Sequence, residues 1–213
     1  MSQIGLPFDW EGQHEGAPFL VSPANQDAVR FIEHWTEWPI PIAILSGPSR
    51  SGRSTLGRQF AHLSNGTVID DAEEIADQTL FHAWNQARDS GRPLLMIARS
   101  APTDWQVGLP DLRSRLLAAP HIRLAQPDDE LVRALIEAGL GRGGSAFSAD
   151  LPEWLARRIE RSYATVAAVL ATLNRDSLSS GRKISVAFAR ESLQRAEFLR
   201  DDEPGPTPDP NGE

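Results

Sequence analysis

Apolar and polar positions follow two different periods along the chain, and the changes between them predict where strands and helices fall. Short continuous apolar runs, bounded by glycine, proline or acidic residues, are typical of strands buried on both faces of a parallel sheet. Three such runs occur, at residues 42–45, 67–69 and 94–98, and residues 121–124, in which polar and apolar positions alternate, fit a final strand. Between them apolar residues recur every three or four positions, as on one face of an amphipathic helix. Strands alternating with helices predict an α/β fold with a doubly wound parallel sheet.

Helices are expected before, between and after these strands. One should begin after Asn25 and end before Pro39, one should follow the first strand through Leu63, one should cover Ala72–Ser90, and a short one should cover Gly108–Leu116. The interval between Leu63 and the second apolar run is short and has no room for an additional strand and helix. We therefore expect a trimmed sheet.

The C-terminal third of the chain carries only the helical period. Amphipathic helices are predicted at 128–138, 152–159 and 163–178 and from 184 to 199, with a loop at Gly139–Ser148. This pattern predicts a small helical lid domain (127–200) after an α/β domain (17–126). Residues 1–16 are expected to form a peptide and linker, and the acidic, proline-containing residues 201–213 a disordered tail.

Composition narrows the class of protein. The net charge is −8 and Lys183 is the only lysine, which argues against dependence on the phosphate backbone of DNA. There is no cysteine, which excludes disulfides and thiol-ligated metal and fits a cytoplasmic protein. No apolar run approaches the length of a membrane span. The sequence does not determine the oligomeric state, and a homo-oligomer is one of the alternatives.

The strongest chemical signal is the glycine-rich stretch after the first strand. Two glycines separated by four residues precede a basic residue and two hydroxyls, in a strand–loop–helix context. Such a loop curls its backbone N–H groups around a phosphate, and the helix N-terminus adds a positive partial charge. Arginine replaces the usual lysine, and its planar fork is not equivalent to an ammonium group. The candidate phosphate-binding residues are Gly47, Pro48, Ser51, Gly52, Arg53, Ser54 and Thr55.

Further candidate residues lie at the ends of other strands and ahead of the first one. Asp70 follows the second apolar run and, with the Ser54 hydroxyl, is a candidate ligand of Mg²⁺, while the adjacent Asp71 lies where a carboxylate can polarise water. In P-loop proteins of the AAA+ type the segment ahead of the first strand helps to hold the base. Val21 and Asn25 are candidates for that wall, with core and helix-cap roles as the alternative.

The N-terminus carries a short apolar peptide with Gln3, Ile4, Leu6, Pro7 and Phe8. Proline disfavours a helix here and favours an extended form. One interpretation is a strand or arm that packs on its own domain. The other is a docking peptide whose apolar side chains fill pockets of a partner while Gln3 supplies a directional hydrogen bond.

Several of these segments together resemble the Hda proteins, bacterial homologues of the replication initiator DnaA that keep its AAA+ module and lack its DNA-binding domain. The most specific is GLPDLRSRL at Gly108–Leu116, which is similar to a GLPDLASRL-type box of that family. The stretches Ala98–Pro102 and Ile159–Thr165 resemble the alphaproteobacterial branch, and the Gly-Arg-Ser of the phosphate loop recurs there. Residues 3–8 lie where Hda proteins carry their clamp-binding peptide.

The resemblance implies a function and roles for particular residues. Docked on the β sliding clamp of DNA polymerase III, such a protein stimulates hydrolysis of the ATP held by DnaA. Arg115 would be the arginine finger, inserted in trans, with Arg113 as the fallback. The chain's own nucleotide, ADP or ATP, would then be structural. The lid arginine of DnaA aligns with Ala164, so Arg161 is the candidate substitute, and Arg99 and Ser100 also depart from the polar residues expected after the third strand.

Three other functions fit parts of the pattern. An autonomous P-loop ATPase of the helicase-loader type would hydrolyse ATP alone and bind nucleic acid. A small-molecule phosphotransferase would use a loop lysine and an arginine-rich lid. An adaptor with an inactive nucleotide site would bind clamp and DnaA without needing Arg115.

Overall fold

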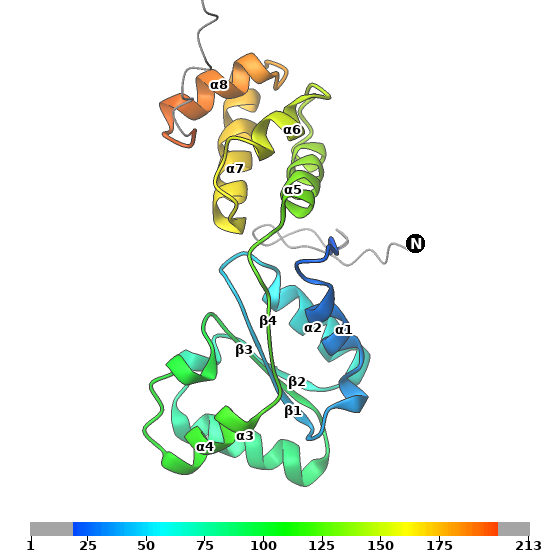
Figure 1. Ribbon diagram of the computed structural model, residues 1–213, viewed down its shortest axis with the longest axis vertical. Helices are drawn as coiled ribbons and strands as arrows, with labels where there is room; N and C mark the ends of the chain where they lie inside the picture. Colours follow the sequence, from blue (N-terminus) through cyan, green and yellow to red (C-terminus); the bar gives the residue numbers. More distant parts are fainter. Residues whose placement is uncertain (1–18, 200–213) are drawn as a thin grey trace, which may run out of the picture.

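The computed structural model describes residues 19–199, in which a parallel four-stranded sheet is flanked by helices and followed by a group of helices (Figure 1). The strands are β1 (Ile42–Ser46), β2 (Thr67–Ile69), β3 (Leu94–Ala98) and β4 (His121–Arg123), in the order β2-β3-β1-β4. The prediction of an α/β fold with a trimmed parallel sheet is confirmed. The expected N-terminal peptide 1–16 and the tail 201–213 lie outside the described residues.

The two central strands are buried along their whole length, which explains their unbroken apolar runs. In the register, Ile42 lies opposite Leu94 and Ser46 lies opposite Ala98. Successive side chains point to opposite faces, so each face of the sheet has its own core. One core includes side chains of α1 (Gln26–Glu33) and α2 (Arg53–Ser64), and the other includes side chains of α3 (Asp77–Ser90) and α4 (Pro110–Ala118).

The expectation of one helix over Ala72–Ser90 is wrong at its start. Residues 72–74 form a 3₁₀ turn, Ile75 and Ala76 have extended backbone, and α3 begins at Asp77. The later start of α3 is explained by a contact between segments distant in the sequence, which the local pattern of apolar residues cannot indicate. The Asp77 carboxylate accepts hydrogen bonds from the backbone N–H groups of Gly108 at 2.7 Å and Leu109 at 2.9 Å. The start of α3 is thereby tied to the segment that leads into α4.

The remaining helices form the predicted lid. They are α5 (Asp129–Arg142), α6 (Leu151–Ala156), α7 (Tyr163–Ser180) and α8 (Val186–Arg195), and α5 packs on α6 and α7 while α7 packs on α8. The loop expected to begin at Gly139 is a helix as far as Arg142. A Cβ at Gly139 would lie 2.4 Å from Cδ1 of Leu170, so glycine here permits close helix packing and does not end the helix. Within residues 19–199, no helix is long and apolar enough to cross a membrane.

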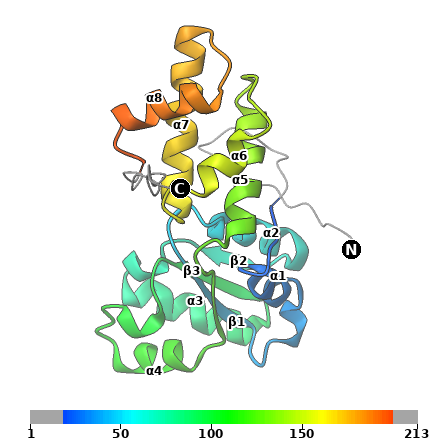
Figure 2. The ribbon, with the colours of Figure 1, turned by 45° about the horizontal axis from the view of Figure 1, so that its top comes forward.

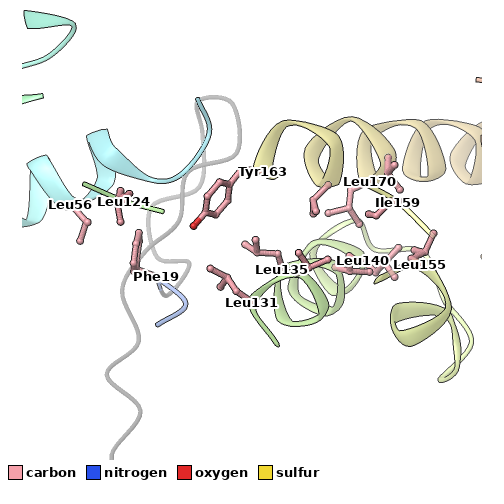
Figure 3. Close-up of a cluster of buried hydrophobic side chains, with 14 of the residues drawn as sticks. Phe19, Leu56, Leu124, Leu131, Leu135, Leu140, Leu155, Ile159, Tyr163 and Leu170 are labelled. Atoms are coloured by element: carbon pink, nitrogen blue, oxygen red, sulfur yellow. The ribbon is translucent and has the colours of Figure 1, made fainter. Parts of the chain in front are cut away.

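The lid and the α/β part share one apolar cluster (Figure 3). Phe19, Leu56 and Leu124 from the α/β side meet Leu131 and Tyr163 from α5 and α7. Figure 2 shows α5 and α7 standing at the end of the sheet where β4 leads into α5. The loop that follows β1 lies at this same end, so the fold places the lid beside the candidate phosphate site.

One carboxylate fixes the junction between the two parts. Asp128 accepts a hydrogen bond from the backbone N–H of Leu131 at 2.7 Å, which caps α5. Its other oxygen accepts from the backbone N–H of Ala24 at 3.2 Å, in the segment ahead of α1. The same side chain therefore holds both the segment ahead of α1 and the first helix of the lid.

Candidate functional site

The loop between β1 and α2 has the backbone geometry that its glycines predict. Gly52 has a φ of 89°, in the left-handed region, and a Cβ there would lie 2.6 Å from Cε2 of Phe19. At Gly47 a Cβ would lie 2.8 Å from the Cβ of Leu124. No side chain among residues 19–199 caps the N-terminus of α2. Its first backbone N–H groups are therefore available to an anion.

A cavity of about 260 Å³ lies between this loop and the lid. One wall is polar and carries several arginines, and the other is mainly apolar and belongs to α5 and α7. This pairing suits a ligand with an anionic end and an apolar end. The lining residues are Arg50, Gly52, Arg53, Ser54, Thr55, Arg58, Leu135, Gly139, Arg142, Tyr163, Val166, Ala167 and Leu170.

Three buried polar atoms at this site have no hydrogen-bond partner within the described part of the chain. They are the hydroxyl of Ser51, Nη1 of Arg53 and the hydroxyl of Tyr163. Buried polar groups are normally paired, because an unpaired one keeps its full desolvation cost. Arg53 and Tyr163 line the cavity, and Ser51 belongs to the same loop as Arg53. These unpaired donors fit a site that is completed by a polar ligand, and phosphate oxygens accept from all three donor types.

Competing effects act on the pKa of Arg53, and the net direction is downward. Burial lowers the pKa of its guanidinium, while Asp70, Glu73 and Asp71 raise it and Arg99 lowers it. The group is partly desolvated and lies in the field of the acidic segment after β2. A bound phosphate would offset the free-energy cost of this desolvation, since the guanidinium would gain a charged hydrogen-bond partner.

Tyr163 differs from the loop residues because it supplies an unpaired donor from the lid side of the cavity. It is 4% exposed, and burial with a smaller contribution from Asp128 raises the pKa of its phenol to about 12. The hydroxyl therefore keeps its proton at neutral pH and can donate a hydrogen bond. Tyr163 is the first residue of α7, so a ligand bonded to it would also contact the lid.

The acidic segment after β2 is engaged by the residue that follows β3. Arg99 forms ion pairs with Asp71 at 3.4 Å and Glu74 at 3.1 Å, and its backbone N–H donates to Oε1 of Glu73 at 2.8 Å. The neighbouring strands β2 and β3 bring these groups together, as predicted for strand ends at one edge of a sheet. The carboxylate of Asp71, the candidate for polarising water, is thus already paired with a cation.

The side chains near the loop are compatible with Mg²⁺ that is bound jointly by the protein and a nucleotide. Within residues 19–199 no group of three or more histidine, cysteine or acidic side chains could hold a metal by itself. Magnesium commonly takes only one or two protein oxygens and completes its shell with phosphates and water. Ser54 and Asp70 supply a hydroxyl and a carboxylate, and both side chains are exposed.

Six of the ten predicted nucleotide-site residues are not among the described residues that line the cavity. They are Gly47, Pro48 and Ser51 in the loop, and Val21, Asn25 and Arg161 outside it. Val21 is 42% exposed, and Asn25 is buried, with its amide bonded to the backbone of Ser22 and Leu20 at 2.9 and 2.8 Å. Neither is among the described lining residues of the cavity. Asn25 lies at the N-cap position of α1, but its side chain makes no cap hydrogen bond there, and its burial fits the core alternative. Arg161 pairs with Asp129 at 3.0 Å and borders a separate open hollow on the lid.

Sequence reasoning missed the contribution of the lid to the cavity, above all Tyr163 and Arg142. A signal for the first was present, because Tyr163 is the only tyrosine in the chain and follows the N-cap Ser162. Arg142 was hidden by the expected loop from Gly139. Once α5 is extended, Leu135, Gly139 and Arg142 fall on one face, at spacings of four and three residues.

The candidate finger Arg115 lies on α4, at the opposite end of the molecule from the lid and its cavity (Figures 1 and 2). Its guanidinium is paired with Asp111 on its own helix and hydrogen-bonded to Asn85 of α3. Arg113, the fallback, is exposed, and its guanidinium forms no hydrogen bond or ion pair within residues 19–199. The structure thus keeps both arginines away from the loop of their own chain.

Comparison with known proteins supports the fold. No protein-family model matches the sequence. Domain III of the replication initiation protein DnaA from Thermotoga maritima superimposes with a TM-score of 0.69 at 15% identity, covering 84% of this chain and 94% of that one. AMPPCP-bound DnaA from Aquifex aeolicus gives 0.62 at 13% identity, covering 84% and 68%. The RuvB Holliday junction branch migration motor of Thermotoga maritima gives 0.59 at 13% identity, covering 80% and 66%. The chain therefore has the AAA+ fold found in domain III of DnaA.

Proposed function

We propose that this protein is a cytoplasmic negative regulator of chromosomal replication initiation, which stimulates hydrolysis of the ATP bound to DnaA. It docks on the β sliding clamp of DNA polymerase III through Gln3, Ile4, Leu6, Pro7 and Phe8, and it makes no sequence-specific contact with DNA. One observation carries the proposal. The cavity and helix α4, which carries Arg113 and Arg115, lie at opposite ends of the molecule, so these two arginines belong to a part remote from the proposed ligand of the chain itself.

The chain's own ligand is ADP or ATP with Mg²⁺, and its role is structural. Buried unpaired donors in the loop and on α7 flank the same cavity, so a nucleotide held there contacts both parts of the molecule. Ser54 and Asp70 would hold the metal, which screens phosphate charge when bound. The similarly folded Aquifex aeolicus DnaA is a complex with AMPPCP, which supports a nucleotide at this position.

Weak turnover at that site follows from the ion pairs of Arg99. A carboxylate that polarises water must be free to accept a proton or a hydrogen bond from it. Asp71 and Glu74 are both paired with Arg99, and Asp71 has a shorter side chain than glutamate. We therefore expect slow ATP hydrolysis by the isolated chain.

Stimulation in trans relies on a guanidinium placed at the γ-phosphate of the partner's ATP. Charge develops on the phosphoryl oxygens and the bridging oxygen as the terminal P–O bond breaks, and a fixed cation stabilises it. A finger of this kind is worth about 10³–10⁵ in rate. Arg115 is the proposed finger. Its position on a helix of the rigid α/β part favours defined placement, since helix α4 packs on α3.

The test is ATP hydrolysis by DnaA in the presence of DNA-loaded clamp. The wild type is compared with Arg115→Ala and with a variant in which Gln3, Leu6 and Phe8 are all replaced by alanine. We expect acceleration by the wild type and loss of it in both variants. Acceleration by Arg115→Ala at the wild-type level would favour an adaptor without a finger. Hydrolysis by this chain alone, with no effect on DnaA, would identify an autonomous ATPase.

A further inference from the structure

The guanidinium of Arg115 is held on three sides by other side chains. Asp111 accepts from Nε at 3.1 Å and from Nη2 at 2.7 Å, and Oδ1 of Asn85 accepts from Nη1 at 2.8 Å. The ring of Phe81 lies under the guanidinium, 4.9 Å from its central carbon. Asn85 and Phe81 belong to α3, so the finger is fixed between two helices and not only along its own.

The clamped guanidinium can still donate to a phosphate. Arginine has five N–H donors, of which these contacts use three, so two N–H groups on Nη1 and Nη2 remain. The side chain is 24% exposed, which keeps part of the group open to a partner. Arg113, two residues away, contrasts with it, because its side chain is exposed and has no polar contact within residues 19–199.

We propose that Asn85 is a positioning residue for the finger, which orients Arg115 without cancelling its charge. The inference rests on the proposed function and adds a residue outside the sequence box that contains Arg115. Asp111 already supplies one carboxylate, and its side chain is 63% exposed, so water screens that pair. A second carboxylate would neutralise the guanidinium further. The amide of Asn85 fixes the third nitrogen and leaves the net charge unchanged.

Positioning has a kinetic consequence that docking does not share. A free arginine samples many rotamers, and ordering it in the transition state costs entropy at each turnover. Removal of the Asn85 amide should therefore lower the maximal stimulated rate and leave the concentration for half-maximal stimulation unchanged. Misplacement of a reacting group by about 1 Å costs on the order of a hundredfold. For Asn85→Ala we expect a fall of about tenfold to a hundredfold in the maximal rate.

The experiment titrates each variant into DnaA–ATP with DNA-loaded clamp and fits the maximal rate and the half-maximal concentration separately. Gln86→Ala is the matched control, because Gln86 carries the same amide on the next position of α3 and is exposed. It should behave as wild type. Asn85→Asp keeps the acceptor and adds charge, so it should also lower the maximal rate. Asn85→Ala combined with Arg115→Ala should be no slower than Arg115→Ala alone.

The outcomes separate this inference from the proposed function. If the wild type stimulates, Arg115→Ala does not, and Asn85→Ala equals the wild type in maximal rate, the positioning role is wrong and the finger stands. A faster Asn85→Ala would also overturn it, since the amide would then restrain the finger. A change confined to the half-maximal concentration would place Asn85 in docking. If the wild type itself fails to stimulate, the proposed function falls and this inference falls with it.

Discussion

The substitution Tyr163→Phe removes one buried hydroxyl and keeps the ring, so its effects on folding and on ligand binding can be separated. Tyr163 is 4% exposed, and its hydroxyl has no hydrogen-bond partner within residues 19–199. Leaving such a group unpaired costs about 1–3 kcal/mol. Because Tyr163→Phe abolishes that cost, we expect the free energy of unfolding of the nucleotide-free protein to rise by about 1–3 kcal/mol.

Ser177→Ala is the matched control for folding. Ser177 lies on the same helix and is also buried, but its hydroxyl donates to the carbonyl oxygen of Arg182 at 2.7 Å. Its loss should lower the free energy of unfolding by about 1 kcal/mol, because a satisfied hydrogen bond is removed. Urea unfolding of the two variants without nucleotide should therefore show shifts of opposite sign.

The expected effect on binding has the reverse sign for Tyr163→Phe. A hydrogen bond to a charged group contributes about 1.5–3 kcal/mol, so loss of a bond to a phosphate raises the Kd for ADP roughly tenfold to a hundredfold. Titration calorimetry measures this, and Ser177→Ala should bind as wild type. A Tyr163→Phe protein that is less stable without nucleotide and binds ADP as tightly as the wild type would show that the hydroxyl is neither unpaired in the free protein nor a ligand donor.

Three further predictions concern the loop and the sheet. Gly52→Ala should lower the free energy of unfolding by at least about 1–2 kcal/mol in urea melts, because φ is 89° and the new Cβ would collide with Phe19. Gly91 also has a positive φ, but a Cβ there would have no neighbour within 4 Å, so Gly91→Ala should lower the free energy of unfolding less. Arg53→Ala should abolish ADP binding in calorimetry. Arg53→Lys should retain part of it, because lysine keeps the positive charge but not the forked hydrogen bonds of arginine. Equal binding by the wild type and both variants would show that Arg53 does not contact the nucleotide. Burial and Arg123 lower the pKa of His121, whose Nε2 lies 2.8 Å from the Ser46 hydroxyl, so the folded state favours the neutral ring. That contribution is present above a pH of about 6.5 and is lost as the pH falls, so thermal melts between pH 7.5 and 5.5 should show a larger loss for wild type than for His121→Gln.

The sequence predicts the sheet well because its signals are local. Unbroken apolar runs require burial on both faces, and β1 and β3 have that environment. The phosphate loop is equally readable, because a left-handed backbone at Gly52 favours glycine whatever surrounds it. The period of apolar residues gave wrong helix boundaries where contacts between distant segments determine them. Asp77 delays the start of α3 through its bonds to the segment before α4, and Leu170 makes Gly139 part of a helix.

The candidate site was predictable only on its α/β side. Glycines and hydroxyls at fixed spacing define the loop, whereas the lid wall is assembled from residues on two separate helices. Val21 and Arg161 had no local feature that fixed where their side chains point. Asn85 carries no sequence signal of its own, since one amide on an amphipathic helix is ordinary, and its contact with Arg115 spans 30 positions.

The central claim is that Arg115 acts on ATP held by DnaA and not on the chain's own nucleotide. The most direct measurement is single-turnover hydrolysis of labelled ATP preloaded on DnaA, with DNA-loaded clamp and with this protein carrying unlabelled ADP. We expect the wild type to accelerate release of labelled phosphate and Arg115→Ala to return the rate to that of DnaA alone. Equal acceleration by wild type and Arg115→Ala would contradict the central claim.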